Sequence, residues 1–363
     1  MLNTQFWKGR GGTLTVIGIV LMLSMVVWVG CAEQQQDPVS PEQSDVVEDI
    51  VLLEEEPEVQ EAMIVQDRYT DELLTIDNVV GTATGMTEDG RPAILILTKQ
   101  ELQTRALNKE APLPAELDNI PVRELVTGEI RALKGPPGGG GGFDPKDKHR
   151  PAPNGVSLGH PDITAGTLGC LVEKGGTTYI LSNNHVMANE NNANNGDDIL
   201  QPGPFDGGGP GDEIATLSDW VNIVFSTSAN NVVDAAIAAV DPADVTGETV
   251  TYGAPNTITS NASVNMRVEK YGRTTESTRG RVQGINATVN VGYDTGVARF
   301  VGQIVIGGGG FSSGGDSGSL IVVQKGSDKG KPVGLLFAGG GGTTIANPID
   351  DVLSAFNVTI VGN

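Results

Sequence analysis

Cysteine is scarce in this sequence of 363 residues, which contains only Cys31 and Cys170. Cys31 closes an apolar N-terminal segment and belongs to that segment, so a single cysteine is left for the folded remainder. A disulfide within a folded domain is therefore excluded, although the aliphatic content is sufficient for packed cores. We expect Cys170 to be a buried apolar residue with no redox or catalytic role.

Basic residues are also few, most of all near the N-terminus. The chain has 23 Lys and Arg against 45 Asp and Glu, which gives a formal net charge of −22. Such a charge repels the phosphate backbone, so nucleic acid is not expected as a partner. The stretch from Glu33 to Glu61 holds eleven acidic residues and no Lys or Arg. We predict that residues 32–58 form an acidic, disordered tether.

A long apolar run lies near the N-terminus, from Thr13 to Val29, between the cations Lys8 and Arg10 and the pair Gly30-Cys31. A short cationic segment before an apolar core is typical of a signal peptide, with a single membrane helix as the rival interpretation. A small residue followed by cysteine resembles a bacterial lipoprotein signal. This resemblance implies that residues 1–31 are a lipoprotein-type signal peptide and that Cys31 is lipidated. The protein would then lie in the bacterial cell envelope, outside the cytoplasm, anchored to the membrane.

Histidine occurs only at positions 149, 160 and 185. His149 lies in the basic segment 146–150, which indicates a solvated patch and a plausible cleavage site, and His160 lies in a loop. His185 follows an apolar run, Tyr179–Leu181, and the polar residues 182–184, which places its imidazole at the end of a buried strand. A lone histidine is more often structural, but His185 is the one credible catalytic base.

A carboxylate and a hydroxyl complete a candidate catalytic group. Asp234 interrupts an otherwise apolar stretch, so its charge needs a partner, and a neutral histidine fits because one ring nitrogen is bound and the other stays free as a base. Ser317 lies in Gly314-Gly315-Asp316-Ser317-Gly318. Glycine here allows the amides of Gly315 and Ser317 to converge on an oxyanion, whereas the alternative is a plain surface turn.

Together these segments resemble the trypsin-like serine proteases of the chymotrypsin clan, in their bacterial, disulfide-free form. The order His185, Asp234, Ser317 is the order of the chymotrypsin triad. Five segments carry the resemblance: residues 182–186 are similar to the histidine box of HtrA-type proteases, 233–238 to the aspartate box, 315–319 to the serine box, 271–275 with Gly280 and Val282 to the strand that opens the second barrel, and 333–340 to the strand that lines the substrate cleft.

The resemblance covers roughly the last 200 residues, and it implies a trypsin-like domain over residues 154–363. The fold class we expect is mainly β, a chymotrypsin-like double β-barrel preceded by a small α/β domain. In such a site Ser317 is the nucleophile, His185 the base and Asp234 the group that orients it, while the amides of Gly315 and Ser317 form the oxyanion hole. Short apolar runs, such as 169–172, 221–225 and 333–337, are the expected strands.

The substrate pocket implied by the resemblance is formed by Phe311, Ala338 and Gly339. Phe311 stands six residues before Ser317, where trypsin has an acidic residue. We therefore expect small or apolar side chains to be preferred over Lys or Arg. Phe337 stands where most relatives have a serine that hydrogen-bonds the catalytic aspartate, which indicates that Asp234 is held in another way.

A small α/β domain is predicted over residues 59–134. Apolar residues from Ala62 to Leu74 recur at helical spacing, and strands over 79–86 and 93–98 are joined by a turn with an Asp-Gly pair, which favours a hairpin. A further helix is expected over 99–108 and a last strand over 121–133. The domain has no nucleophile or ligand cluster, and its role is open between a folding or inhibitory pro-region and a spacer or interaction module. Residues 135–153, rich in Gly and Pro, are the predicted linker.

The function predicted from these residues is that of an exported serine endopeptidase acting on polypeptide substrates through an acyl-enzyme. The alternative is a protease-like chaperone or peptide-binding module of the cell envelope that does not turn over substrate. We expect no cofactor and no metal site. The asparagine-rich loop 189–198 has enough oxygen ligands for calcium, but without a fixed ligand spacing it favours turn chemistry.

Overall fold

The computed structural model describes residues 50–102, 113–133 and 143–363. The predicted signal peptide with Cys31, most of the acidic tether, most of the helix expected over 99–108 and the glycine run of the linker lie outside these residues. In the described ranges, no helix is both long enough and apolar enough to cross a membrane.

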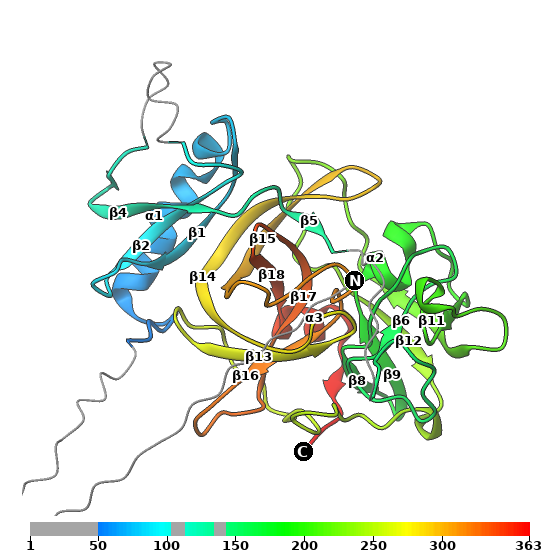
Figure 1. The fold of residues 1–363 in the computed structure, drawn as a ribbon. Coiled ribbons are helices and arrows are strands. Elements are labelled where there is room, and N and C mark those ends of the chain that lie inside the picture. The colour runs from blue at the N-terminus through cyan, green and yellow to red at the C-terminus, as the bar shows by residue number, and fades with distance from the viewer. Residues whose placement is uncertain (1–49, 103–112, 134–142) are drawn as a thin grey trace, which may run out of the picture. The chain divides into compact units, whose positions relative to one another are not determined.

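The N-terminal part consists of one helix packed on a small sheet (Figure 1). Helix α1 (Pro57–Leu73) begins with a proline, whose fixed φ suits the first helical turn, and it buries an apolar face that includes Val59, Ala62 and Val65. Strands β1 (Val79–Met86) and β2 (Pro92–Thr98) form the predicted antiparallel hairpin. Its turn uses Gly90 with φ +87°, a conformation that favours glycine. Strand β4 (Ile120–Val126) pairs parallel to β2 and antiparallel to β3 (Glu116–Leu117).

The single strand expected over 121–133 is two separate strands. β4 ends at Val126, and Gly128, with φ +68°, turns the chain out of the sheet. The next strand, β5 (Arg131–Ala132), pairs with β14 and β17 of the C-terminal part. A positive φ is available to glycine at little cost, which explains why the break falls there.

The first barrel is built on a six-stranded antiparallel sheet in the order β10–β11–β12–β9–β8–β19. The chain end supplies its last strand, so residues far apart in sequence close this half of the molecule. The bounds are β8 (Cys170–Lys174), β9 (Thr177–Ser182), β10 (Asp198–Leu200), β11 (Glu213–Trp220), β12 (Ala236–Val240) and β19 (Thr359–Ile360), with the short pair β6 (Ser157–Leu158) and β7 (Gly166–Thr167) beside them.

The second barrel is a closed ring of six strands, because β13 pairs with both β16 and β14. The order is β13–β16–β17–β18–β15–β14 and back to β13. Strand β1 of the N-terminal hairpin pairs antiparallel with β14, so the small sheet continues the barrel sheet (Figure 1). The bounds are β13 (Arg267–Gly272), β14 (Glu276–Gly292), β15 (Val297–Gly307), β16 (Leu320–Val323), β17 (Pro332–Gly340) and β18 (Thr343–Pro348).

Two short helices complete the double barrel: α2 (Asn184–Met187) directly follows β9, and α3 (Ile349–Phe356) follows β18. Short 3-10 turns occur at Asn189–Asn191, Pro204–Asp206 and Pro242–Asp244. The mainly β class with a double barrel and a small α/β part in front is as predicted.

The strand expected over 221–225 is wrong. These residues are irregular, because amide side chains replace the partner strand: Asn191 Oδ1 accepts from the amide of Ile223 at 3.0 Å, and Asn231 Oδ1 accepts from the amide of Val224 at 2.8 Å. Backbone groups whose hydrogen bonds are made by side chains do not need a neighbouring β-strand as partner.

One apolar cluster joins the two barrels. It contains Cys170 and Leu181 from the first barrel, Leu320 and Leu335 from the second, and Phe356 from α3. Burial of this cluster holds the strand before His185 against the strand after Ser317, so packing rather than a covalent bond sets the relative position of the barrels.

Candidate active site

His185 lies in the first turn of α2, where β9 has just ended, and its side chain is buried. Its Nδ1 is 2.6 Å from Asp234 Oδ2, and its backbone amide donates to Asp234 Oδ1 at 3.2 Å. Because an ionised carboxylate can only accept, Nδ1 carries the hydrogen and Nε2 is left as the basic nitrogen. Nε2 is buried and has no hydrogen-bond partner among the described residues.

Asp234 is fully buried in the loop just before β12. Its amide donates to Asn347 Oδ1 at 3.1 Å, and its carbonyl accepts from Asn183 Nδ2 at 2.7 Å. Asn183 belongs to the segment 182–186, the predicted histidine box. This segment therefore carries His185 and also holds the backbone of Asp234 in place. The backbone of Asp234 is therefore held by two amide side chains, one at the start of α2 and one in β18.

Tyr293 supplies a hydrogen bond to the carboxylate that the sequence did not predict. Its hydroxyl donates to Asp234 Oδ2 at 2.9 Å. Burial, and next the charge of Asp234, raise the pKa of Tyr293 well above its ordinary value, so the phenol stays a neutral donor. Phe337 instead packs its ring against Phe300, with ring centroids 4.8 Å apart. Tyr293 therefore supplies a side-chain hydrogen bond to Asp234 that the ring of Phe337 cannot make.

Ser317 is buried in the turn before β16. Its hydroxyl donates to the carbonyl oxygen of Phe337 at 3.1 Å. The structure therefore joins His185 to Asp234 by hydrogen bonds but does not join Ser317 to His185. The serine hydroxyl and the free Nε2 would meet only after the hydroxyl leaves the Phe337 carbonyl.

The turn that carries Ser317 is fixed by the buried carboxylate of Asp316. This carboxylate accepts from the amides of Thr274, Thr275 and Ser313 at 2.9, 3.1 and 2.9 Å, and the ammonium of Lys270 lies 3.6 Å away. Burial lowers the pKa of Lys270, and the charge of Asp316 opposes that shift. The arrangement keeps Gly315 at φ +94°, a conformation open to glycine.

The Gly315 amide and two residues of β17, Ala338 and Gly339, are bonded to residues 131–133, and we call the space that this segment fills the groove. The Gly315 amide donates to the carbonyl of Leu133 at 3.0 Å, while the Ser317 amide makes no backbone hydrogen bond to that carbonyl. Ala338 and Gly339 are in β17 and pair with Ala132 and Arg131 of β5. Phe311, 1% exposed, belongs to the apolar core of the second barrel, against which Leu133 packs.

The other histidines and Cys170 lie outside this group. His160 Nε2 is 3.2 Å from Asp197, and His149 Nε2 is 2.8 Å from the carbonyl of Asp144. Cys170 is buried in the cluster between the barrels, and burial raises the pKa of its thiol to about 12, so it stays protonated. Over the ranges that the structure describes, no group of three or more His, Cys, Asp or Glu could hold a metal ion.

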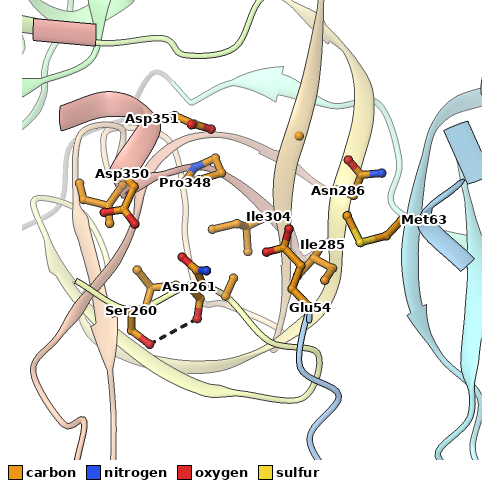
Figure 2. A pocket seen from close by; sticks show the side chains of 14 residues that line it. Glu54, Met63, Ser260, Asn261, Ile285, Asn286, Ile304, Pro348, Asp350 and Asp351 are labelled. Atoms are coloured by element: carbon orange, nitrogen blue, oxygen red, sulfur yellow. Dashed lines mark hydrogen bonds between the residues drawn. The ribbon is translucent and has the colours of Figure 1, made fainter. Parts of the chain in front are cut away.

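A cavity of about 310 Å³ lies away from this site, beside the segment that leads into α1 (Figure 2). Glu54 and Met63 lie on one side of it, and Asp350 and Asp351, at the start of α3, lie on the other. Partial loss of hydration raises the pKa of Glu54 and of Asp351, and neighbouring carboxylates add to both shifts. No histidine or cysteine is among the described residues that line this cavity.

No family model matches this sequence, and no curated protein does. Among solved structures, it is similar to a glutamic acid-specific serine protease described as using a novel histidine triad in substrate binding, and to Thermobifida fusca protease A. Each is 20% identical with a TM-score of 0.43, covering 58% of this chain and 100% of the other. Cellulomonas bogoriensis chymotrypsin is 18% identical with a TM-score of 0.39, covering 58% and 98%. At identities this low, the likenesses assign no role to any side chain.

Proposed function

We propose that this protein is a serine endopeptidase in which Ser317 attacks the substrate carbonyl and His185 takes the proton. Asp234 would orient His185 and stabilise its charged form, and the amide of Gly315 would hold the oxyanion, together with the amide of Ser317 once substrate is bound. The observation that carries the proposal is the buried His185–Asp234 pair, bonded at 2.6 Å, whose outer nitrogen is uncommitted. A buried polar atom without a hydrogen-bond partner destabilises the folded state. Nε2 would gain a partner by accepting the hydroxyl proton of Ser317.

The first test is the hydrolysis of an unfolded protein substrate by the full chain, with covalent labelling by a fluorophosphonate probe. Wild type should hydrolyse the substrate and take up one label at Ser317. Ser317→Ala should take up none, and its turnover should fall by about 10⁴-fold or more, because the nucleophile is lost. His185→Ala should lose turnover to a comparable degree. Turnover that survives Ser317→Ala would rule out the proposed nucleophile.

A second candidate function is peptide binding without turnover. The observations in its favour are that the Ser317 hydroxyl is engaged by Phe337 and that a strand of the chain itself lies in the groove. A binding module would retain affinity for peptides while failing to react with the probe, even when the groove is emptied. Probe labelling of Ser317 therefore separates the two functions.

We also propose that the protein is exported and lipid-anchored through Cys31. The support is the sequence alone: Lys8 and Arg10, the apolar run that follows, and Gly30-Cys31. Cells fed a radiolabelled fatty acid should incorporate it into the wild-type chain and into a Cys170→Ser control, but not into Cys31→Ser. Equal incorporation into Cys31→Ser would remove the anchor from the proposal.

A further inference from the structure

The groove of the candidate site is filled by a segment of the protein itself, Ile130 to Leu133. Its strand β5 lies antiparallel to β17, with Ala132 opposite Ala338 and Arg131 opposite Gly339. On its other side, the carbonyl of Ile130 accepts from the amide of Gly292, at the end of β14. The segment is therefore hydrogen-bonded on both edges, as an extended peptide is when it adds a strand to a sheet (Figure 1).

The backbone of Leu133 is hydrogen-bonded at both its amide and its carbonyl by residues of the candidate site. Its amide donates to the carbonyl of Phe337 at 3.4 Å, and its carbonyl accepts from the amide of Gly315 at 3.0 Å. Phe337 also accepts from the hydroxyl of Ser317, so Leu133 and the proposed nucleophile meet at one backbone carbonyl. An amide aimed at a peptide carbonyl next to a serine is the contact that polarises the carbonyl for attack.

The side chain of Leu133 defines what the pocket accepts. It packs, half-buried, against the apolar core cluster of the second barrel, which contains Phe311. Its Cδ1 is 3.3 Å from the point where a Cβ on Gly339 would stand, so this glycine leaves room for a branched side chain. A charged side chain would lose its hydration against this apolar cluster.

We propose that the site cuts after leucine or an apolar residue of similar size, and that the bond following Leu133 in this chain is its first substrate. This inference rests on the proposed endopeptidase function. Ser317 Oγ would bond to the Leu133 carbonyl carbon while the bond to the nitrogen of Lys134 breaks, and the serine proton would pass through His185 to that nitrogen. Water then hydrolyses the ester, which leaves a carboxylate on Leu133, a free amine on Lys134 and an unmodified Ser317.

The basic segment 146–150, a plausible cleavage site from sequence, is less suited to cutting. The amide of His149 donates to Gln201 Oε1 at 2.9 Å, and the guanidinium of Arg150 donates to the same oxygen at 2.6 Å. Lys148 pairs with Asp212 at 2.7 Å. Proteases need an extended, accessible strand, and this segment is bound to the first barrel instead.

The test follows the full chain with time by intact mass and N-terminal sequencing. Wild type should split once, giving a fragment that begins at Lys134, at a rate independent of protein concentration because the groove and the segment belong to one molecule. Ser317→Ala should stay intact. Leu133→Asp should slow the cut at least about 100-fold, since it loses apolar contact and places a charge in an apolar pocket, whereas Leu133→Met should still be cut.

Val126→Asp is the matched control, because it introduces the same charge seven residues upstream at a side chain that is 42% exposed. It should be cut at the wild-type rate. A new N-terminus within 146–151, or cutting of Leu133→Asp as fast as wild type, would overturn the inference.

Two further measurements separate this inference from the proposed function. Reporter amides with the sequence Ile-Arg-Ala-X should be cut at least about tenfold faster when X is leucine than when X is alanine. The reporters in which X is arginine or glutamate should be cut more slowly than the alanine reporter. If the fluorophosphonate labels Ser317 in Leu133→Asp, but wild type never splits or arginine is preferred, the inference fails and the endopeptidase stands. If Ser317 is labelled neither in wild type nor in Leu133→Asp, both fail.

Discussion

The hydroxyl of Tyr293 donates to Asp234 Oδ2, at 2.9 Å, which is the same oxygen that lies 2.6 Å from His185 Nδ1. Tyr293 follows the last residue of β14, and its amide donates to the carbonyl of Gly296 across the β14–β15 turn. The carboxylate of Glu190 accepts from the amides of Asp294 and Thr295 in the same turn. The aspartate is thus oriented by a hairpin of the second barrel.

Tyr293→Phe should lower activity without emptying the groove. It removes one hydrogen bond to a buried carboxylate, a change of about 1.5–3 kcal/mol, so kcat should fall by roughly 10-fold to 150-fold. KM should change little, because Tyr293 is not among the residues that pair with β5. Steady-state kinetics on a leucine reporter peptide measure both constants.

The control is Tyr271→Phe, which alters another buried tyrosine, 3% exposed, without a hydrogen bond to Asp234. If both variants lose kcat equally, the effect is general destabilisation, and Tyr293 has no positioning role. A rise in KM with unchanged kcat would likewise contradict the orienting role.

Lys270→Met should damage both stability and the proposed oxyanion site. The ammonium is buried 3.6 Å from Asp316, and removing one partner of a buried pair costs about 3–5 kcal/mol because the other charge is left uncompensated. Asp316 keeps its three backbone donors, which should hold the fold together. We expect a lower melting temperature and a lower rate of Ser317 labelling.

Lys331→Met is the matched control for this change, since Lys331 pairs with Asp328 at a partly exposed site. Surface pairs contribute little, so its melting temperature should stay near that of wild type. Equal losses of melting temperature in the two variants would show that the buried Lys270–Asp316 pair contributes no more to stability than the surface pair.

Several features were predictable because their signals are local. The helix over 57–73 and the hairpin at Asp89-Gly90 follow from apolar spacing and from a turn residue with positive φ. The buried charge of Asp234 could be noticed in sequence because a lone carboxylate in an apolar run demands a partner. The hydrogen bond between His185 and Asp234 agrees with that reasoning.

Other features depend on contacts between distant parts of the chain and left no local signal. Tyr293 lies 59 positions from Asp234 in a turn without a motif. The sequence over 121–133 predicts one continuous strand. In the structure, β5 is separate from β4 because β5 pairs with β14 and β17. Asn191 and Asn231 turn 221–225 into irregular chain by bonding its backbone, which apolar content alone could not indicate.

Acid should stabilise the folded protein through Glu54 and Asp351, which line the cavity between the segment before α1 and the start of α3. Burial raises the pKa of Glu54 above its ordinary value of 4.5 and that of Asp351 above 3.8, so the folded state binds protons more tightly than the unfolded state (Figure 2). The resulting stability is fully present below the ordinary values and is lost as pH rises through the raised ones. Melting temperatures measured from pH 4 to 7 should show this decline.

Glu54→Gln should flatten that decline and raise stability at neutral pH, because the amide needs no proton to enter the cavity. Glu88→Gln, in the exposed turn between β1 and β2, removes the same charge elsewhere and should leave the pH dependence of wild type in place. A decline as steep in Glu54→Gln as in Glu88→Gln would mean that Glu54 does not contribute.

Gly340→Ala should loosen the segment in the groove while sparing the barrel. A Cβ on Gly340 would collide with the carbonyl oxygen of Glu129 and stand 3.0 Å from that of Thr127, and both belong to the stretch between β4 and β5. Overpacking of this kind costs about 1–3 kcal/mol, which would here be relieved by moving the segment away. Ser317 should then react with the fluorophosphonate roughly 5-fold to 150-fold faster, and the cut after Leu133 should slow.

Gly309→Ala, where a Cβ meets open space, should react like wild type. Faster labelling in both variants would place the effect in the flexibility of the glycine runs, and no change in Gly340→Ala would mean that Ile130–Leu133 does not restrict the groove.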